Sequence, residues 1–473
     1  MTLSFTRTLT GINELISAKL PAENGFKLRF YRLALINILS NLMVPLSSFL
    51  GISFLGHLET LSPLAGVTLA TVLFNYLYRL LGFLRMSTTG TTAQAVGRSD
   101  KTEVQLILLR NLSLALLLGV LIILLSYPVQ QLGFSWLNAT DTVKSSGIDY
   151  YNSRIWGIPA GLLNFVIIGW FLGQEAGGKV LLLSVIGNGA NILLDYWFIV
   201  RLQLASSGAG MAAAISQYLM CLVGIAMIAQ VIRRVELRHL LTQVIEKMAL
   251  IEVFRFNLDI FIRTLAFLTV FSIFTGLSAG MGTEVLAENA LLLEVITLVV
   301  YLVDGLAYAT ETFAGNFAGQ SQRTKLLLLL RIAGATSLLI GLSCASVFTM
   351  FPQPLLGLLT NHQEIMQPLH QVVFWLLPIL GFGSLAFMLD GYFLGLAEGK
   401  ILRNTALLAS IIGFLPIAIT AWQWHSQQWL WLSLTCFMLL RVVLLVRYIP
   451  HSFVAPQTKN SESIAQEVRF ETN

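Results

Sequence analysis

The chain has 473 residues, of which 56% are hydrophobic and 11% are charged, with a formal net charge of +5 and a mean hydropathy of +0.76. This balance excludes an ordinary soluble domain and indicates a chain that lies mostly in lipid. Cys221, Cys344 and Cys436 share no CxxC spacing, and no HExxH arrangement occurs, so we expect neither a disulfide framework nor a metal-hydrolysis site.

Apolar stretches long enough to cross a bilayer, which takes about 20 residues, recur along the whole chain. They predict twelve transmembrane helices, at 30–56, 66–96, 104–127, 149–171, 179–200, 208–232, 249–279, 287–317, 325–350, 370–395, 401–421 and 428–448. The expected fold is therefore an all-α polytopic membrane protein.

The polar segments between and beyond the spans divide the chain into five parts. We expect a cytoplasmic leader at 1–29, a six-helix lobe at 30–232, a cytoplasmic linker at 233–248, a second six-helix lobe at 249–448 and a cytoplasmic tail at 449–473. The leader shows no charged region followed by an apolar core and a cleavage site, so no removable signal peptide is expected.

Basic residues predict the orientation of the helices in the membrane. If the amino terminus is inside, the outer loops hold only Lys144 and Arg201. The inner loops hold Arg98, Lys101, Lys179, Arg233, Arg234, Arg238, Lys247, Arg323, Lys325, Lys400 and Arg403. This bias predicts that both termini lie in the cytoplasm. The expected location is the bacterial plasma membrane. No basic stripe with interleaved aromatic residues occurs, so we expect lipid contact and no nucleic-acid partner.

One phrase occurs twice, as GWFLGQEAGGK at 169–179 and as GYFLGLAEGK at 391–400. The same shift of 222 positions carries Gly97 onto Gly319 and Lys101 onto Arg323. Because six helices separate the copies, the two halves are predicted to be repeats that run in the same direction through the membrane. Each copy contains GxxxG, a spacing that favours close helix packing, so the phrase itself is interpreted as structural.

The fifth predicted helix carries a polar face, because Ser184, Asn188, Asn191 and Asp195 are spaced by four, three and four residues. Ionisable residues within membrane spans are functional candidates. A carboxylate beside two amides suits a proton or a sodium ion, and a cluster of hydrogen bonds between helices is the structural alternative. We expect no other metal and no cofactor.

The repeat allows a comparison of the two halves at this face. Since the second phrase is one residue shorter, a shift of 221 maps the four residues onto Thr405, Ala409, Ile412 and Pro416. The second half therefore lacks the amides and the acid, which favours a specialised cation site in the first half.

The eighth predicted helix carries a second polar face with the same periodicity. Its members are Thr297, Tyr301, Asp304, Tyr308 and Glu311. The corresponding face of the second helix includes Arg79, with Arg85 close by. One half thus presents acids and phenols, and the other presents guanidinium groups. These residues are candidates for a substrate cavity or a proton relay, and packing networks are the alternative.

Two further positions carry charge within spans. Asp259 and Arg263 lie four residues apart in the seventh helix, and we expect them to pair with each other. Asp390 directly precedes the second copy of the doubled phrase and is a further candidate for the central cavity.

Taken together, several stretches resemble the multidrug and toxic compound extrusion (MATE) transporters, and among them the DinF-like branch. They are FLGHL at 54–58, LRMSTTGTTAQAVG at 84–97, NILLDYWFIV at 191–200, FIRTLA at 261–266, ENALLLEVITLVVYLVDGLAYATETFAG at 288–315 and DGYFLG at 390–395. The resemblance covers the first ten helices and is specific as a set.

The resemblance implies a V-shaped antiporter of two six-helix lobes around a central cavity, which exchanges an organic substrate for protons or sodium. It also implies a cation site in the first lobe, built from an acid of helix five and an acid of helix one. Asp195, with Asn191 beside it, matches the helix-five position. Gly51 stands where the branch has the helix-one acid, so the usual two-acid scheme does not apply unchanged.

Three functions follow as hypotheses. The first is secondary active efflux of a small organic substrate by a monomer, with Asp195 as the coupling group. The second is a flippase for lipid-linked saccharides, for which Arg79 and Arg85 would supply cationic contacts. The third is a polytopic membrane enzyme, which the absence of GxSxG and HExxH disfavours. Buried acids suit an organic cation, while the arginines leave anions and zwitterions open, and the choice between protons and sodium stays open as well.

Overall fold

A computed structural model describes residues 23–58, 60–135, 139–231, 240, 243–244, 246–357 and 369–453. The leader up to residue 22, most of the expected linker with Arg233, Arg234 and Arg238, and the tail from residue 454 lie outside the described residues. In the described part, twelve helices are long and apolar enough to cross a membrane, and no strand occurs there.

The first half of the chain forms the helices of the first repeat. They are α2 (Glu23–Gly56), α3 (Ser62–Leu81), α4 (Phe83–Gly97), α5 (Lys101–Leu124), α6 (Ser126–Ser135), α7 (Asp141–Arg154), η1 (Ile155–Gly157), α8 (Ile158–Gly173), α9 (Gly177–Asp195), η2 (Tyr196–Arg201) and α10 (Ala205–Ala229). Three spans are composite, since α3 continues into α4, α7 continues through η1 into α8, and α9 continues into η2.

The second half forms the second repeat. Its helices are α12 (Lys247–Gly280), α13 (Thr283–Gly319), α14 (Arg323–Met350), α15 (Pro352–Leu356), η3 (Val373–Trp375), α17 (Leu376–Gly395), α18 (Gly399–Leu408), η4 (Ala409–Phe414), α19 (Leu415–Gln423), α20 (Gln427–Tyr448) and η5 (Ile449–Phe453). The predicted edges mostly fall within a few residues of these helix ends. Two starts differ more. The first helix begins at Glu23 rather than at 30. The fourth span begins at Asp141 rather than at 149, because its polar first turns pack on α3 at Gly66 instead of facing lipid.

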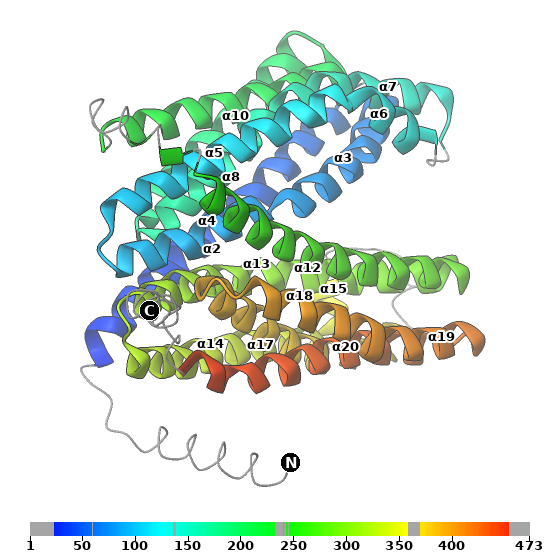
Figure 1. The fold of residues 1–473 in the computed structure, drawn as a ribbon. Coiled ribbons are helices and arrows are strands. Elements are labelled where there is room, and N and C mark those ends of the chain that lie inside the picture. The colour runs from blue at the N-terminus through cyan, green and yellow to red at the C-terminus, as the bar shows by residue number, and fades with distance from the viewer. Residues whose placement is uncertain are drawn as a thin grey trace, which may run out of the picture.

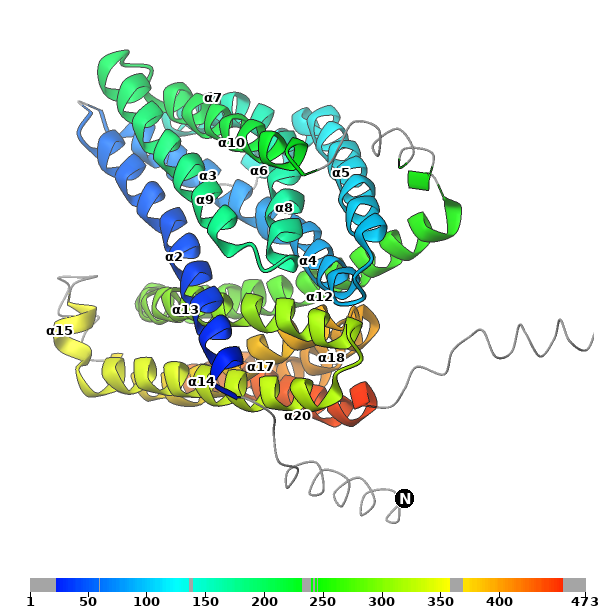
Figure 2. The same cartoon turned by 90° about the vertical axis from the view of Figure 1, so that its left-hand side faces the viewer.

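The two repeats form two lobes that meet at one end and diverge at the other (Figure 1). The first helix of each repeat crosses between the lobes. Figure 2 shows α2 running from the second lobe to the first. The ring of Phe26 in α2 packs on the ring of Phe313 in α13, with the ring centroids 5.3 Å apart. In α12, Asn257 accepts a hydrogen bond of 2.6 Å from Ser87 of α4. Each lobe is therefore tied to the other by one long helix.

Left-handed backbone positions show the repeat directly. Ser99 (φ 59°) and Ser321 (φ 55°) are 222 positions apart, as are Glu175 (φ 59°) and Ala397 (φ 56°). Gln203 (φ 54°) and His425 (φ 48°) are also 222 positions apart, and each follows the fifth span of its repeat. Non-glycine residues adopt this conformation rarely, so matched pairs indicate equivalent turns in the two halves.

The shift of 221 that we expected for the fifth helix is therefore wrong by one residue. Because the turn before the helix has the same conformation in both halves, α18 begins at Gly399 as α9 begins at Gly177. With a shift of 222, the polar face maps onto Ala406, Ser410, Gly413 and Ile417. The amides and the acid are still missing from the second half, so the asymmetry between the lobes remains.

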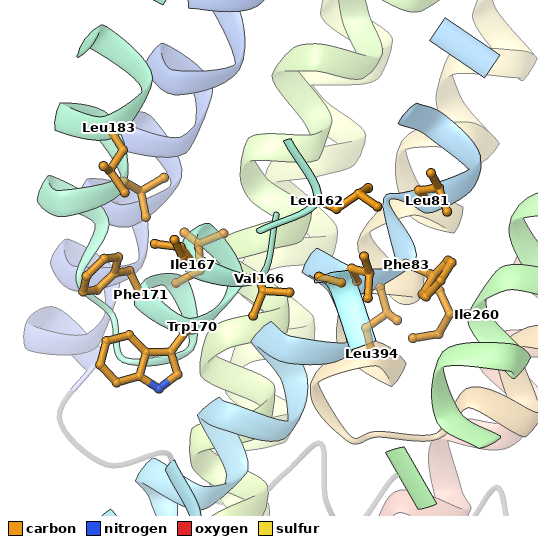
Figure 3. Close-up of a cluster of buried hydrophobic side chains, with 14 of the residues drawn as sticks. Leu81, Phe83, Leu162, Val166, Ile167, Trp170, Phe171, Leu183, Ile260 and Leu394 are labelled. Atoms are coloured by element: carbon orange, nitrogen blue, oxygen red, sulfur yellow. The ribbon is translucent and has the colours of Figure 1, made fainter. Parts of the chain in front are cut away.

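Apolar side chains hold the lobes together where they meet. One buried cluster includes Val166 and Trp170 of α8, Phe83 of α4, Ile260 of α12 and Leu394 of α17, and so joins both lobes (Figure 3). The indole of Trp170 in this cluster donates a hydrogen bond of 2.8 Å to the Val104 carbonyl. A second cluster consists of second-lobe residues only. Continuous burial across the junction stabilises the end at which the lobes meet.

Candidate functional site

The end at which the lobes meet is closed by direct contact between backbones. A Cβ atom added at Gly97 would lie 2.3 Å from the Asn316 carbonyl oxygen, and one added at Gly319 would lie 2.2 Å from the Gln94 carbonyl oxygen. Side chains larger than glycine would therefore hold the two helices apart. We call this junction of α4 with α13 the closed end.

Both copies of the doubled phrase lie at the closed end. Thr312 of α13 donates a hydrogen bond of 3.1 Å to the Leu172 carbonyl, and Gln94 of α4 donates one of 2.9 Å to the Gly395 carbonyl. Each bond links a backbone carbonyl within one phrase to the opposite lobe. The phrase is therefore more than a packing motif within its own lobe, because it forms part of the contact between the lobes.

Glu175, which lies within the first phrase, connects three helices at the closed end. Its carboxylate forms an ion pair with Arg29 of α2 and accepts a hydrogen bond of 2.7 Å from Asn316 of α13. The equivalent position in the second half is Ala397, so this ionic contact occurs on one side of the junction only.

Asp195 is the last α-helical residue of α9, and its side chain is 5% exposed. Its Oδ2 accepts a hydrogen bond of 3.0 Å from the Asn191 amide. The Oδ1 atom of Asn191 in turn accepts one of 3.2 Å from Ser47 of α2. The π-helix η2 follows directly after Asp195, and such widened turns are frequent at functional sites. Ser47, Asn191 and Asp195 therefore form a chain of hydrogen bonds that ends at one buried carboxylate.

Helix α2 approaches this carboxylate at the position that the resemblance singled out. A Cβ atom at Gly51 would lie 3.0 Å from Asp195 Oδ2. An acid at residue 51 would thus point at Asp195, whereas glycine leaves Asp195 as the acid at this contact. The guanidinium of Arg154 on α7 lies near enough to act on Asp195 electrostatically.

The remaining residues of the predicted helix-five face do not bond to Asp195. The amide of Asn188 donates to the backbone carbonyl of Ser184, one turn earlier in α9, over 2.8 Å. Ser184 is buried and Asn188 is half-buried. The structure therefore brings Asn191 and Asp195 together and adds Ser47, which the sequence did not indicate because its hydroxyl is one of many within α2.

The helix-eight face lies on α13 and meets α4 at the junction. Arg85 Nη1 of α4 lies 3.5 Å from Glu311 Oε2, and the Arg85 guanidinium carbon lies 3.7 Å from the centre of the Tyr308 ring. The acids and phenols of one half and the guanidinium of the other therefore form one cluster between the lobes.

Asp304, Tyr301 and Arg79 extend this cluster along α13 and α3. Asp304 is half-buried, and the guanidinium groups of Arg85, Arg263 and Arg79 lie near enough to act on its carboxylate. Arg79 is exposed and also acts on Tyr301. Arg79 and Arg85 thus face different surroundings, since only Arg85 is enclosed by an acid and a phenol ring.

The expected pair of Asp259 with Arg263 is wrong. Asp259 lies 2.5 Å from Arg403 Nη1 of α18, and Arg263 pairs with Asp390 of α17. Asp390 also pairs with Arg441 of α20, so one carboxylate holds two guanidinium groups. A spacing of four residues permits a pair within one helix, but neighbouring helices here offer better placed partners.

Arg441 was missed as a site residue, although a lone charge in the middle of an apolar span could have indicated it. Its side chain is 1% exposed. Three phenyl rings surround its guanidinium carbon, those of Phe267, Phe437 and Phe387, at 5.4, 5.5 and 5.8 Å. Cation–π contacts of this kind stabilise an arginine in an apolar setting.

Two cavities lie at the boundary between the lobes. One of about 560 Å³ is lined mainly by apolar side chains of α3 and α12, including Leu77 and Leu268. Tyr76 and Ser272, whose hydroxyl groups are 3.4 Å apart, link the two helices there. The other, of about 300 Å³, lies between α4, α5 and α12 and is lined by Arg110 and Asn257 among others. Within the described ranges, no group of three or more His, Cys, Asp or Glu side chains lies together as a metal site.

Comparison with known proteins agrees with this geometry. Residues 37–197 and 260–419 match MatE, one segment in each repeat. The chain belongs to the MatE family. This MatE protein is 32% identical to the DNA damage-inducible protein F of Escherichia coli (strain K12) over 413 residues, which cover 87% of the chain and 89% of that relative. The expected membership of the multidrug and toxic compound extrusion transporters, in their DinF-like branch, is confirmed.

Other relatives are more distant. The MatE protein is 24% identical to Protein DETOXIFICATION 44, chloroplastic, of Arabidopsis thaliana, over 84% of the chain and 77% of that protein. A solved structure described as the outward-facing conformation of a multidrug resistance MATE family transporter superposes with a TM-score of 0.81 at 20% identity, covering 90% of this chain and 96% of that one.

The expected fold class is confirmed as well. A MOP superfamily transporter from Pyrococcus furiosus, whose structure is described as having a binding pocket of reverse polarity, gives a TM-score of 0.81 at 19% identity, over 90% of this chain and 96% of that one. Its family and fold make the MatE protein a multi-pass membrane transporter, and its described residues form twelve helices able to span a membrane, in two repeats of six.

Proposed function

We propose that the protein is a secondary active efflux antiporter, which exports a small organic substrate in exchange for protons or sodium. The observation that carries this proposal is the buried Asp195 carboxylate, which lies between α9 and α2 with Asn191 and Ser47 beside it. A site between two helices binds a cation with an affinity that depends on how those helices are placed. Cation binding can then favour one arrangement of the lobes over the other.

The arrangement of the lobes supports alternating access. The chain is closed where α4 meets α13 and diverges at the opposite end (Figure 1). Basic residues lie in or beside the turns on the closed side, among them Arg98, Lys101, Lys179, Arg323 and Lys400. By the bias of basic residues, the closed end faces the cytoplasm and the described state opens outward.

The flippase alternative loses support from the surroundings of Arg85. A flippase for lipid-linked saccharides needs cationic groups that are free to hold phosphates, but Arg85 is paired with Glu311 and stacked on Tyr308. A second acid, Asp304, lies close to the same guanidinium. We therefore favour a substrate that carries a positive charge, for which carboxylates and aromatic rings are suitable partners.

Transport by reconstituted protein tests the proposal. Purified protein in liposomes should move a fluorescent organic cation when a proton or a sodium gradient is imposed, each in a separate experiment. Asp195→Asn should abolish the gradient-driven component, because it removes the charge that responds to the cation. Asp149→Asn, which changes an exposed carboxylate of α7, is the matched control and should transport normally. Undiminished gradient-driven transport by Asp195→Asn would overturn the proposal.

A further inference from the structure

The ion pair of Arg85 with Glu311 joins the two lobes. Arg85 belongs to α4 of the first lobe and Glu311 to α13 of the second, with Nη1 and Oε2 3.5 Å apart. Glu311 is fully buried, and Arg85 is 8% exposed. The pair lies next to the contacts of the closed end, since the neighbouring Thr312 bonds to the Leu172 carbonyl across the same boundary.

Glu311 depends on this one contact to an unusual degree. Within the part of the chain that the structure describes, neither carboxylate oxygen of Glu311 accepts a hydrogen bond. Neither terminal nitrogen of Arg85 donates one there. Buried carboxylates ordinarily gain such bonds, so the arrangement leaves the electrostatic attraction of Arg85 as the main compensation for the charge on Glu311.

The other charged groups near Glu311 belong to its own lobe. On α13 itself the charged group is Asp304, with the neutral phenol of Tyr308 beside it, and on α12 it is Arg263. Arg263 already pairs with Asp390 of α17, and Asp390 also pairs with Arg441 of α20. Arg85 is therefore the neighbour whose distance from Glu311 changes when the lobes move relative to each other.

We propose that Glu311 is a second proton-binding site, which is ionised while Arg85 lies against it and protonated once the closed end opens. Separation of α4 from α13 would leave a carboxylate in the protein interior without its counter-charge, which is strongly unfavourable. A proton that reaches Glu311 from the outer side neutralises the carboxylate to a carboxylic acid, which releases Arg85 and allows the closed end to open. The proton then leaves to the cytoplasm and Arg85 pairs with Glu311 again, so protons move inward as antiport requires. This inference rests on the proposed transport function and adds a coupling group to it.

The inference predicts that acid opens the closed end. Because the ionised form of Glu311 binds Arg85 and the protonated form does not, protonation weakens the contact between the lobes. Opening can be followed with Thr312→Cys, a buried probe that packs across the boundary, in protein whose three native cysteines are replaced by serine. The alkylation rate of Thr312→Cys in detergent solution is divided by the rate of Thr324→Cys, an exposed reference position at the same end of the molecule.

The normalised alkylation rate should rise as the pH falls, by up to about tenfold per pH unit, the change in the protonated-to-ionised ratio of one carboxyl group. Glu311→Gln should react fast at every pH, since an amide cannot hold Arg85 by charge. Glu288→Gln is the matched control: Glu288 is a buried glutamate of the same helix that is bonded to Gln427 of its own lobe over 2.9 Å. This control should keep the pH profile.

Exchange of the two charges provides the second test. The double variant Arg85→Glu with Glu311→Arg keeps an ion pair across the boundary and should restore slow alkylation at neutral pH together with the acid response. If Glu311→Gln keeps the pH profile of the parent, or the exchange variant fails to restore it, the inference is overturned. If the alkylation rate depends on pH as expected but no ion gradient drives transport, the antiport function is overturned while proton binding by Glu311 stands.

Discussion

The carboxylate of Asp195 faces the α-carbon of Gly51, so that a methyl group on that glycine would lie 3.0 Å from Oδ2. Helices α9 and α2 are therefore in close contact beside Asp195. The glycine leaves room around the carboxylate that a second acid would fill. Three predictions follow from this contact and from two others that join helices, and each tests a single side chain.

Gly51→Ala should weaken cation coupling. The added Cβ forces the Asp195 carboxylate to shift, and overpacking of this kind costs about 1–3 kcal/mol. We expect the proton or sodium concentration for half-maximal transport to rise about tenfold, which corresponds to about 1.4 kcal/mol. The measurement is substrate efflux from proteoliposomes at a series of imposed cation concentrations.

Gly189→Ala is the control for this change. It lies on α9 as well, but a Cβ there meets no atom within 4 Å. It should leave coupling unchanged and, by helix propensity, stabilise the fold by about 0.5–1 kcal/mol. Equal coupling in both variants would show that the room at Gly51 has no role in cation binding.

Asp390→Asn should destabilise the second lobe. Removing the charge leaves the guanidinium groups of Arg263 and Arg441 buried without their shared partner. Breaking a buried ion pair in this way costs about 3–5 kcal/mol. We expect a clear fall in the thermal unfolding midpoint of the detergent-solubilised protein, whereas Asp149→Asn on the surface of α7 should change stability by less than about 0.5 kcal/mol.

A second-site change separates the charge effect at Asp390 from a loss of packing. Adding Arg441→Met to Asp390→Asn removes one of the two unpaired charges and should recover part of the lost stability. If the single variant unfolds at the temperature of Asp149→Asn, or the added change lowers stability further, the carboxylate does not act as the shared counter-charge.

Gly319→Ala should open the closed end. The new methyl group would lie 2.2 Å from the Gln94 carbonyl oxygen and 2.9 Å from Gly97 Cα, so backbone must move. Spin labels at Thr102→Cys and Thr324→Cys, equivalent exposed positions in the two lobes, report the separation by dipolar spectroscopy. We expect the distance to lengthen. Gly276→Ala on α12, where a Cβ meets nothing within 4 Å, should leave it unchanged.

The contrast between Asp195 and Asp259 shows how far sequence patterns reach. The face with Asn191 and Asp195 was predicted from spacing along one helix, and these two residues do bond to each other. Asp259 and Arg263 have the same spacing and yet pair with Arg403 and Asp390. Spacing tells which residues share a face, but the partner depends on what the adjacent helices place there.

The register of the repeat shows the same limit. The length of the doubled phrase suggested a shift of 221 after it, whereas the left-handed turns at Glu175 and Ala397 keep a shift of 222. Backbone conformation decides which residues are equivalent. The conclusion that the second half lacks the acid was insensitive to this error, because neither register places a charge or an amide there.

The sequence by itself determined the twelve spans, the duplication and the family, because burial in lipid demands long apolar helices and a repeat leaves matching letters. Only the tertiary structure decided that Gly51 faces Asp195, that Asp390 holds two arginines and that Arg85 meets Glu311 between the lobes. These contacts join helices far apart in the chain. Their distances follow from how the lobes pack, which the local order of residues does not specify.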